Sequence, residues 1–328
     1  MNEKNASKHF GLSGPGVALA LVSAVGFSTL GIFATQLYGF GFSVPQTLAW
    51  RFTVASVFLW CFIGIRKRMR SRGRPLDGMG SLERQPGGMS PVSATAFASG
   101  KAKATRDLLL LALFGFTPQA GLYFLTVKLL APGITSLLLY LYPAFVLLVS
   151  AFFLHRKPSA GQLVALVMSF LGCVVTFFEP GAYPLAGLLL GVLVAISYGA
   201  YLVCGEKILA DFDPFFSTAV IMTTAGIFYW GLLLIGGFPV KVPGSFVEWF
   251  FIACLALIAT VLPITTLFSA MKRIGAANAS LISTVEPVVT VLFSALMLGE
   301  ELTANRIWGG LFILGGVVTL RLFSLKRA

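Results

Sequence analysis

The sequence predicts an all-helical integral membrane protein with ten transmembrane helices, arranged as two inverted repeats of five helices. Three observations lead to this fold class: the composition, ten long apolar segments and an internal repeat. Of the 328 residues, 57% are hydrophobic and only 11% are charged, whereas soluble domains carry about 25% charged residues. So little charge cannot cover the surface of a soluble protein, and the mean hydropathy of +0.89 agrees.

A helix needs about 20 mostly apolar residues to cross a bilayer. Their continuous apolar character predicts helices, because the strands of a membrane barrel would alternate over about ten residues. The first segment is expected to remain as a span rather than to be cleaved as a signal peptide. The ten segments are 15–37, 44–65, 107–127, 132–154, 160–178, 184–205, 214–236, 248–270, 275–298 and 304–323.

The segments divide the chain into two predicted repeats of five helices, at 15–178 and 184–323, between short tails at 1–14 and 324–328. A polar insertion at 66–106 interrupts the first repeat. Its Gly, Ser, Pro and Arg content without apolar periodicity predicts a disordered cytoplasmic loop. Basic residues beside a membrane typically contact anionic lipid, so the bilayer and not nucleic acid is the expected partner.

The net charge of +12 indicates orientation in the membrane. With a cytoplasmic N-terminus, 20 of the 24 basic residues fall on the inside, ten of them in the 66–106 loop. Only Lys128, Lys241 and Arg306 fall in outside loops, and Arg51 lies within a span. This asymmetry predicts a multi-pass protein of the cytoplasmic (inner) membrane with both termini in the cytoplasm.

The internal repeat aligns residues 131–176 with 275–320 without a gap, at a separation of 144 positions. Pro143 then matches Pro287, and Gly172 matches Gly316. The first spans of the two repeats align at a separation of 171, and the inserted loop accounts for the difference. Since each repeat has an odd number of spans, the two would insert with opposite orientation, as is common in secondary transporters.

Several motifs of the second repeat resemble those of the EamA-type transporters of the drug/metabolite transporter superfamily. They are Ser283-Thr284-Val285-Glu286-Pro287, Leu298-Gly299-Glu300-Glu301-Leu302-Thr303, Gly309-Gly310 and Gly315-Gly316, joined by Arg51-Phe52 in the second span. In the first repeat, Tyr142 stands where the family pattern has Glu before Pro143. The resemblance implies ten helices, cytoplasmic termini and transport of small metabolites, often export. It does not identify the substrate.

Glu286 is the strongest candidate site residue, because it is the twelfth residue of the 275–298 span and thus lies near mid-bilayer. An ionisable group there costs about 2.5–3.5 kcal/mol on insertion scales, so it should face a cavity or a partner. It could bind a cationic substrate group or take up a proton that drives exchange. Alternatively, it shapes the kink at Pro287.

Further predicted substrate-binding residues carry a hydroxyl, phenol or amide group within a span. Taken singly, each hydroxyl more often forms a hydrogen bond between helices than a contact with substrate. Pro143 and Pro287 each remove one helical hydrogen bond and are candidate hinges. Arg51 is favoured as a structural charge, with binding of a substrate carboxylate as the alternative. The substrate-binding candidates besides Glu286 are Tyr140, Tyr142, Ser283, Thr284, Ser28, Gln119, Tyr198, Tyr201 and Thr265.

No pattern of catalytic, metal-binding or cofactor-binding residues stands out. All four cysteines fall inside spans, the two histidines fit no zinc spacing, and there is no nucleotide-binding P-loop. We therefore expect no enzyme activity, no cofactor and a secondary active or facilitative transporter that works by alternating access. Amino acids, related metabolites and drugs all fit. The alternatives are a lipid-scaffolding protein and a membrane enzyme, and homodimerisation is left open.

Overall fold

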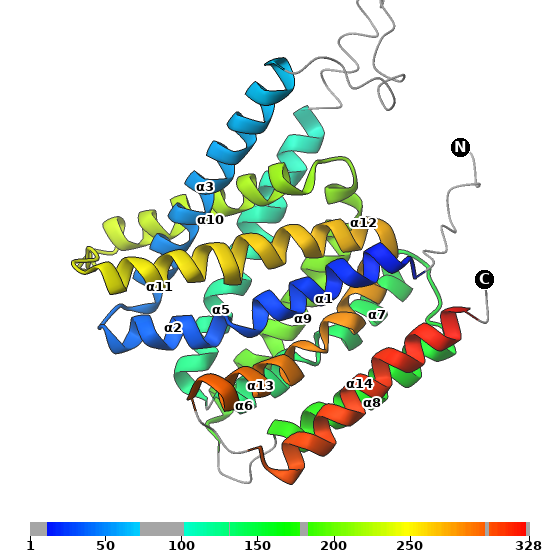
Figure 1. Cartoon of the computed structure of the whole chain (residues 1–328). Coiled ribbons are helices and arrows are strands. Elements are labelled where there is room, and N and C mark those ends of the chain that lie inside the picture. Colours follow the sequence, from blue (N-terminus) through cyan, green and yellow to red (C-terminus); the bar gives the residue numbers. More distant parts are fainter. Residues whose placement is uncertain (1–11, 73–101, 131, 178–182, 299–301, 326–328) are drawn as a thin grey trace, which may run out of the picture.

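The computed structural model describes residues 12–72, 102–130, 132–177, 183–298 and 302–325, and Figure 1 shows their arrangement. Within these ranges the chain consists of helices and short connections, without a strand. Most of the two predicted tails, the centre of the 66–106 loop, and Glu300 and Glu301 lie outside the described residues.

Seven helices are long and apolar enough to cross a membrane, and two shorter apolar helices, Leu137–Phe153 and Ala160–Thr176, accompany them. The chain is therefore a multi-pass membrane protein. The seven are Gly14–Gly39, Val44–Met69, Ala102–Leu129, Leu185–Ala210, Pro214–Ile235, Phe246–Ser283 and Ala304–Phe323.

Several of these long helices are interrupted along their length and therefore consist of more than one helical element. In chain order they are α1 (Gly14–Ser28), α2 (Leu30–Gly39), α3 (Val44–Arg72), the π-helical turn η2 (Leu111–Phe116), α5 (Thr117–Leu129), α6 (Pro132–Leu139), α7 (Tyr142–Phe153), α8 (Ala160–Phe177), α9 (Leu185–Ala210), α10 (Pro214–Ile235), α11 (Phe246–Ala256), the π-helical turn η3 (Leu257–Val261), α12 (Leu262–Ser283), α13 (Glu286–Leu298) and α14 (Ala304–Leu325).

Two helices break immediately before a proline. Tyr140 and Leu141 separate α6 from α7, and two turn residues likewise separate α12 from α13. Pro143 and Pro287 are the second residues of α7 and α13. Proline has no N–H, and its ring clashes with the carbonyl four residues earlier, so it interrupts a continuous helix. It is tolerated in the first turn of a helix, and a new helix therefore begins one residue before each of these two prolines.

The two π-helical turns also precede prolines, Pro118 in α5 and Pro263 in α12. At each turn a threonine hydroxyl donates to the carbonyl five residues earlier. Thr117 donates to Ala112 at 2.8 Å, and Thr260 donates to Leu255 at 2.6 Å. The Ala112 carbonyl also accepts the backbone N–H of Thr117, so the hydroxyl adds a second hydrogen bond to the wider turn.

Gly275 joins two helical segments of α12 without an intervening loop. Its φ of 78° and ψ of 161° reverse the chain direction in a single residue. This left-handed conformation costs glycine little because glycine has no Cβ. The four residues that the sequence analysis placed between the 248–270 and 275–298 spans are helical up to this glycine.

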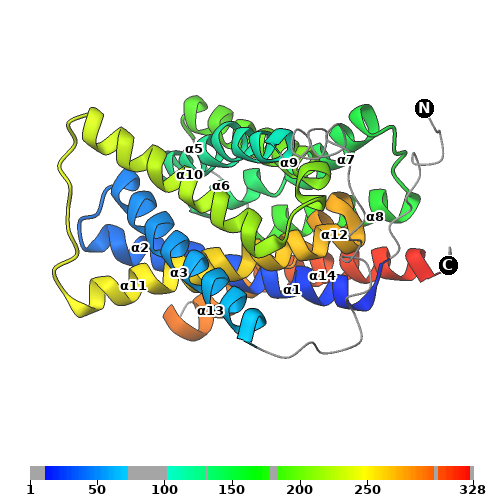
Figure 2. The ribbon, with the colours of Figure 1, turned by 90° about the horizontal axis from the view of Figure 1, so that it is seen from above.

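Close glycine contacts hold α8 against α14. A Cβ at Gly309 would lie 2.6 Å from the carbonyl oxygen of Gly172, and one at Gly316 would lie 2.9 Å from that of Ala165. The helices α3 and α10 form a second pair, and α1 and α12 a third (Figure 2). In the third pair, Ser23 donates to the carbonyl of Pro263 at 2.8 Å.

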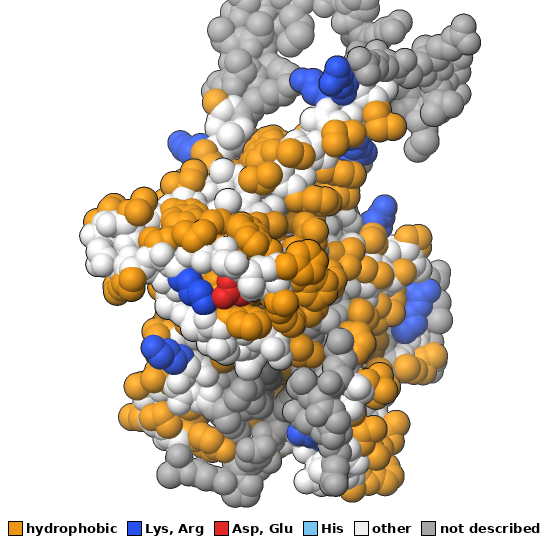
Figure 3. All heavy atoms as spheres, turned by 60° about the vertical axis from the view of Figure 1, so that its left-hand side comes forward, with side chains coloured by type: hydrophobic (Ala, Val, Ile, Leu, Met, Phe, Trp, Pro, Cys, Tyr) orange, Lys and Arg blue, Asp and Glu red, His pale blue; other side chains and the backbone are white. Residues whose placement is uncertain are grey.

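The two described ends of the chain lie at the same end of the bundle (Figure 1). Arg321, near the end of α14, donates a hydrogen bond to the carbonyl of Leu12, just before α1. Over the face in Figure 3, apolar side chains cover most of the described surface and charged ones are few. Phe152, Phe153 and Ile235 are among the most exposed apolar residues, at 76%, 75% and 91%, as expected for side chains that meet lipid.

The edges of the predicted 66–106 loop are helical, which corrects that boundary. The helix α3 continues through the basic run to Arg72, and the next helix already begins at Ala102. Arginine and lysine are good helix formers, so a helix extends beyond its apolar part wherever its basic residues reach water.

Substitution of Gly309 by alanine should destabilise the protein, because the added Cβ would lie 2.0 Å from Thr176 Oγ1 and 2.6 Å from the Gly172 carbonyl oxygen. Overpacking of this kind costs about 1–3 kcal/mol. The measurement is the unfolding temperature of the purified protein in detergent. Gly310→Ala is the matched control, since its Cβ would find only Val288 at 3.7 Å. Equal unfolding temperatures for the two variants would contradict this packing.

Candidate functional site

A cavity lies among helices from both predicted repeats. Its walls are mainly aromatic and aliphatic, with a few polar groups, as is typical of small-molecule sites. The lining residues are Phe27, Leu30, Arg51, Phe116, Gln119, Ala120, Tyr123, Phe124, Leu139, Tyr142, Tyr198, Tyr201, Ile264, Leu267, Phe268 and Glu286.

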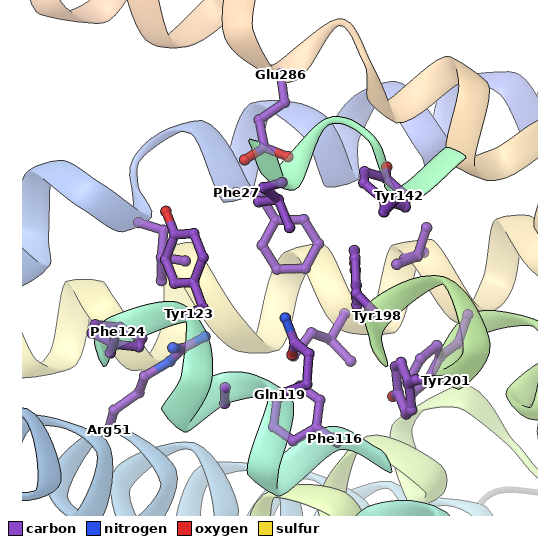
Figure 4. Close-up of a pocket in the computed structure, with 16 residues that line it drawn as sticks. Phe27, Arg51, Phe116, Gln119, Tyr123, Phe124, Tyr142, Tyr198, Tyr201 and Glu286 are labelled. Carbon is purple, nitrogen blue, oxygen red and sulfur yellow. The ribbon is translucent and has the colours of Figure 1, made fainter. Parts of the chain in front are cut away.

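Glu286 enters this cavity from the point where the helix is interrupted. As the first residue of α13, its side chain leaves the backbone at a helix N-terminus, where the helix dipole favours a carboxylate. Its carboxylate group points toward Phe27 and the cavity in Figure 4. Tyr140, in the equivalent interruption of the first repeat, provides a side-chain hydrogen bond to it.

Arg51 reaches the cavity from α3, although only 4% of the residue is exposed. Its Nε donates to the hydroxyl of Thr260, at the π-helical turn η3, over 2.6 Å. Its guanidinium carbon lies 5.1 Å from the ring centroid of Phe52 and 5.8 Å from that of Phe124. These contacts hold the guanidinium group in place against aromatic surfaces.

The two charged groups lie on opposite sides of the cavity, with Phe27 and Tyr123 between them in Figure 4. Glu286 is the only acid and Arg51 the only base among the lining residues. The ion pairs found within the described ranges include neither of them. The cavity therefore presents one acidic and one basic group that form no ion pair with each other.

Aromatic rings that pack on one another form one wall. The ring centroids of Tyr142 and Tyr198 are 4.8 Å apart, and those of Tyr198 and Tyr201 are 6.2 Å apart. The hydroxyl of Tyr142 donates to the carbonyl of Ser280 at 3.1 Å. This bond links α7 to α12 across the two predicted repeats.

Of the predicted substrate-binding residues, five line the cavity: Glu286, Tyr142, Gln119, Tyr198 and Tyr201. Tyr140 adjoins it through Glu286. Pro143 and Pro287 lie at the helix interruptions beside it.

The four predicted serine and threonine residues, Ser28, Ser283, Thr284 and Thr265, are buried but are not among the lining residues. Three of their hydroxyls donate to carbonyls of nearby residues: Ser28 to Val25 at 2.7 Å, Thr284 to Leu281 at 2.6 Å and Thr265 to Val261 at 2.6 Å. Such bonds satisfy a hydroxyl in an apolar bundle without a ligand.

The sequence analysis did not single out Tyr123, Thr260 or most of the apolar lining residues. Apolar residues occur on every side of these helices, so their identity gives no sign of the face that meets the cavity. The sequence nevertheless carries a signal at Thr260: in both repeats a threonine lies shortly before a proline, at Thr117-Pro118 and at Thr260-Val-Leu-Pro263.

Among the described residues, no group of three His, Cys, Asp or Glu side chains could hold a metal ion. The four cysteines are present as free thiols. The chemistry of the cavity is therefore described by its carboxylate, guanidinium, amide and phenol groups.

The sequence profile of the EamA-like transporter family matches residues 14–178 and again 185–322. An uncharacterized transporter of Archaeoglobus fulgidus is 27% identical over 198 residues, 58% of this chain and 69% of that protein. An uncharacterized inner membrane transporter of Salmonella typhimurium is 25% identical over 230 residues, 69% of this chain and 76% of that protein. An uncharacterized transporter of Bacillus subtilis is 26% identical over 232 residues, 66% and 72% of the two chains.

A solved crystal structure matches the fold with a TM-score of 0.72 and 18% sequence identity, over 94% of this chain and 98% of that chain. At this identity the likeness concerns the fold alone.

Proposed function

Because the chain belongs to the EamA-like transporter family, we propose that it exports small metabolites across the cytoplasmic membrane as a secondary active or facilitative transporter. The observation that carries this proposal is the cavity between helices of the two predicted repeats, with isolated charges in an apolar bundle. Transporters of inverted-repeat construction bind their substrates at such an interface and expose the site to each side in turn.

Ten crossings in two inverted halves are part of this proposal. The seven long helices become ten crossings when the chain reversal at Gly275 and the two shorter apolar helices are counted. An even number of crossings agrees with the contact of Arg321 with Leu12, which brings the two ends together. The two matches to the family profile cover nearly the same residues as the two predicted repeats.

The interruptions support the same repeat. Tyr140-Leu141 and Thr284-Val285 occupy equivalent positions in the alignment with a separation of 144. The turns η2 and η3 occupy equivalent helices, and each is followed by a proline. Equivalent irregularities in both halves are what duplication of a five-helix unit produces.

The orientation follows from the positive charges. Basic residues gather in the segments at the end where α1 begins and α14 ends, so this end is assigned to the cytoplasm. The membrane is then the cytoplasmic membrane and both termini are cytoplasmic. The substrates are small metabolites such as amino acids, related compounds or drugs with an apolar body that fits the walls of the cavity.

Overexpression of the protein should cause at least one small metabolite to accumulate in the culture medium, because an exporter lowers the barrier to its exit. The measurement is an untargeted comparison of the medium from cells that express the protein and cells that carry an empty vector. Cells that express Glu286→Gln at the same level are the control for effects of membrane protein production. Identical media from expressing and empty-vector cells would contradict export.

The carboxyl group of Glu286 is proposed to bind a cationic group of the substrate or to carry a coupled proton. Glu286→Gln keeps the size of the side chain but removes its charge. Flux of the exported compound in proteoliposomes should fall at least about tenfold, since charged hydrogen bonds contribute about 1.5–3 kcal/mol. If Glu286 carries the proton, the pH dependence of the flux between about pH 5 and 9 should disappear in Glu286→Gln.

Glu248→Gln is the matched control for this substitution. Glu248 is also a membrane-helix carboxylate, but it pairs with Lys241 at 2.9 Å and does not line the cavity. Unchanged flux and pH dependence in Glu286→Gln would rule out both roles of Glu286.

Alternating access requires contacts that close one end of the cavity and later separate. Glu206 of α9 is a candidate for such a contact at the proposed cytoplasmic end. It is buried, forms an ion pair with Arg156 and accepts a hydrogen bond from the backbone N–H of Ala276 at 2.8 Å. Arg156 belongs to the first half, whereas Glu206 and Ala276 belong to the second, so these bonds would hold the halves together.

Glu206→Gln should open this end more often, because it removes the charge that holds Arg156. The measurement uses a variant whose native cysteines are removed and whose cavity residue Ala120 is replaced by cysteine. In inside-out vesicles, an impermeant maleimide should label this cysteine severalfold faster when Glu206→Gln is also present. Each 1.4 kcal/mol lost changes the open population about tenfold. Asp213→Asn is the control, since it removes a half-exposed ion pair with Arg66 at 3.6 Å. Equal label rates in the two variants would exclude the closing role of Glu206.

A further inference from the structure

We propose that Arg51 binds a carboxylate of the transported molecule and that the cavity selects amphoteric compounds, with their protonated amine directed to Glu286. This inference rests on the proposed transport function and assigns a substrate class to the same cavity. It gives Arg51 a role beyond the structural charge that the sequence favoured.

The guanidinium group of Arg51 has unused hydrogen-bond donors. Only its Nε donates to a described residue, Thr260, and its two terminal Nη atoms form no hydrogen bond or ion pair within the described part of the chain. Arg51 is 4% exposed and lines the cavity. A buried charge without a partner is costly, so the site gains free energy when an anion enters.

The contacts of Arg51 also fix the direction in which it can bind. The bond from Nε to Thr260 and the packing on the rings of Phe52 and Phe124 hold the guanidinium plane. Thr260 itself is oriented by its own donation to Leu255. The two Nη atoms are then presented as a fork, the geometry that accepts both oxygens of a carboxylate.

The charge of the cavity favours a ligand without net charge. Arg51 and Glu286 are its only base and only acid, and they lie on opposite sides of it (Figure 4). A phosphate dianion would require further cations beside Arg51, and none lines the cavity. A molecule with one carboxylate and one ammonium group satisfies both ends at once.

Two further polar groups of the cavity can complete this recognition. In Figure 4 the amide of Gln119 lies beside Arg51, and Tyr123 lies between Arg51 and Glu286. No hydrogen bond of either side chain to a described residue is found, and both line the cavity. The apolar residues Leu139, Ile264 and Leu267 then surround the remaining body of the ligand, which points to amino acids with apolar side chains.

The test measures binding and flux for leucine, valine, methionine and phenylalanine, each compared with its methyl ester, its decarboxylated amine and its deaminated acid. In the wild-type protein, at least one amino acid should bind at least about tenfold more tightly than its ester or amine, which corresponds to 1.4 kcal/mol. In Arg51→Gln the ratio of the affinity for the amino acid to that for its ester or amine should fall to about one. The tighter binding of the amino acid than of its deaminated acid should remain. Arg51→Lys keeps the charge without the fork and should retain part of the preference.

Thr260 provides a second variant in case Arg51→Gln does not fold. It does not line the cavity, so Thr260→Val should weaken the preference for acid over ester only through the position of Arg51. Thr260→Ser keeps the hydroxyl and should restore the preference. A merely structural role would lower the unfolding temperature and affect acid and ester equally.

The proposal and the transport function fail in different ways. Proteoliposomes loaded with a small-molecule extract of the cytosol measure transport without assuming a substrate. If the extract loses compounds but none of the four amino acids binds, or if Arg51→Gln affects acid and ester equally, the amphoteric selectivity is overturned. If no compound leaves, the transport function itself is overturned.

Discussion

Backbone hydrogen bonding inside an apolar layer is the constraint on which the rest of this structure depends. A lipid-exposed carbonyl without a donor is too costly, so irregular backbone occurs only inside the protein or along a cavity. Four such irregularities precede prolines here, and three of them have a lining residue within them or directly beside them: Phe116, Leu139 and Glu286. The fourth, η3, carries Thr260, which accepts the hydrogen bond of the lining residue Arg51. Several of the functional candidates therefore lie at, or are held by, a departure from helical geometry.

The isolation of the two cavity charges has the same origin. Arg51 and Glu286 come from helices on opposite sides, and each is held by a neutral hydroxyl, from Thr260 and Tyr140 respectively. A direct ion pair would have cancelled both charges and left little to attract a polar ligand. Neutral partners orient the groups and leave their charges available, although folding then carries the cost of desolvation without compensation from a counter-charge.

Much of this arrangement could be predicted from the sequence, because hydropathy and proline positions act locally. The starts of α3, α10 and α14 at Val44, Pro214 and Ala304 agree with the predicted segments. Four of the five predicted residues that line the cavity belong to interruptions or to aromatic clusters within spans, and the fifth, Gln119, lies three residues after η2. These signals needed no knowledge of how the helices pack.

Two things could not be predicted: which side of each helix faces the cavity, and which hydrogen-bond partner each polar side chain takes. Whether a serine or threonine hydroxyl serves a ligand or its own helix is decided by a nearby carbonyl, as at Thr265. The contact of Arg51 with Thr260 joins residues 209 positions apart, and one sequence does not reveal such a pair. The extension of α3 to Arg72 depends on where the bilayer ends, which hydropathy locates only approximately.

The turn at Gly275 has a mechanical consequence. A single residue reverses the chain there, so the two helical segments of α12 on either side of Gly275 are joined without a loop that could absorb a displacement. Ala276, which Glu206 holds, begins the helical segment that ends at Ser283, three residues before Glu286. This segment of eight residues is about 12 Å long at 1.5 Å per residue. A tilt at Ala276 therefore moves the far end of the segment directly, and the turn Thr284–Val285 is the first place between Ala276 and Glu286 where the backbone can bend.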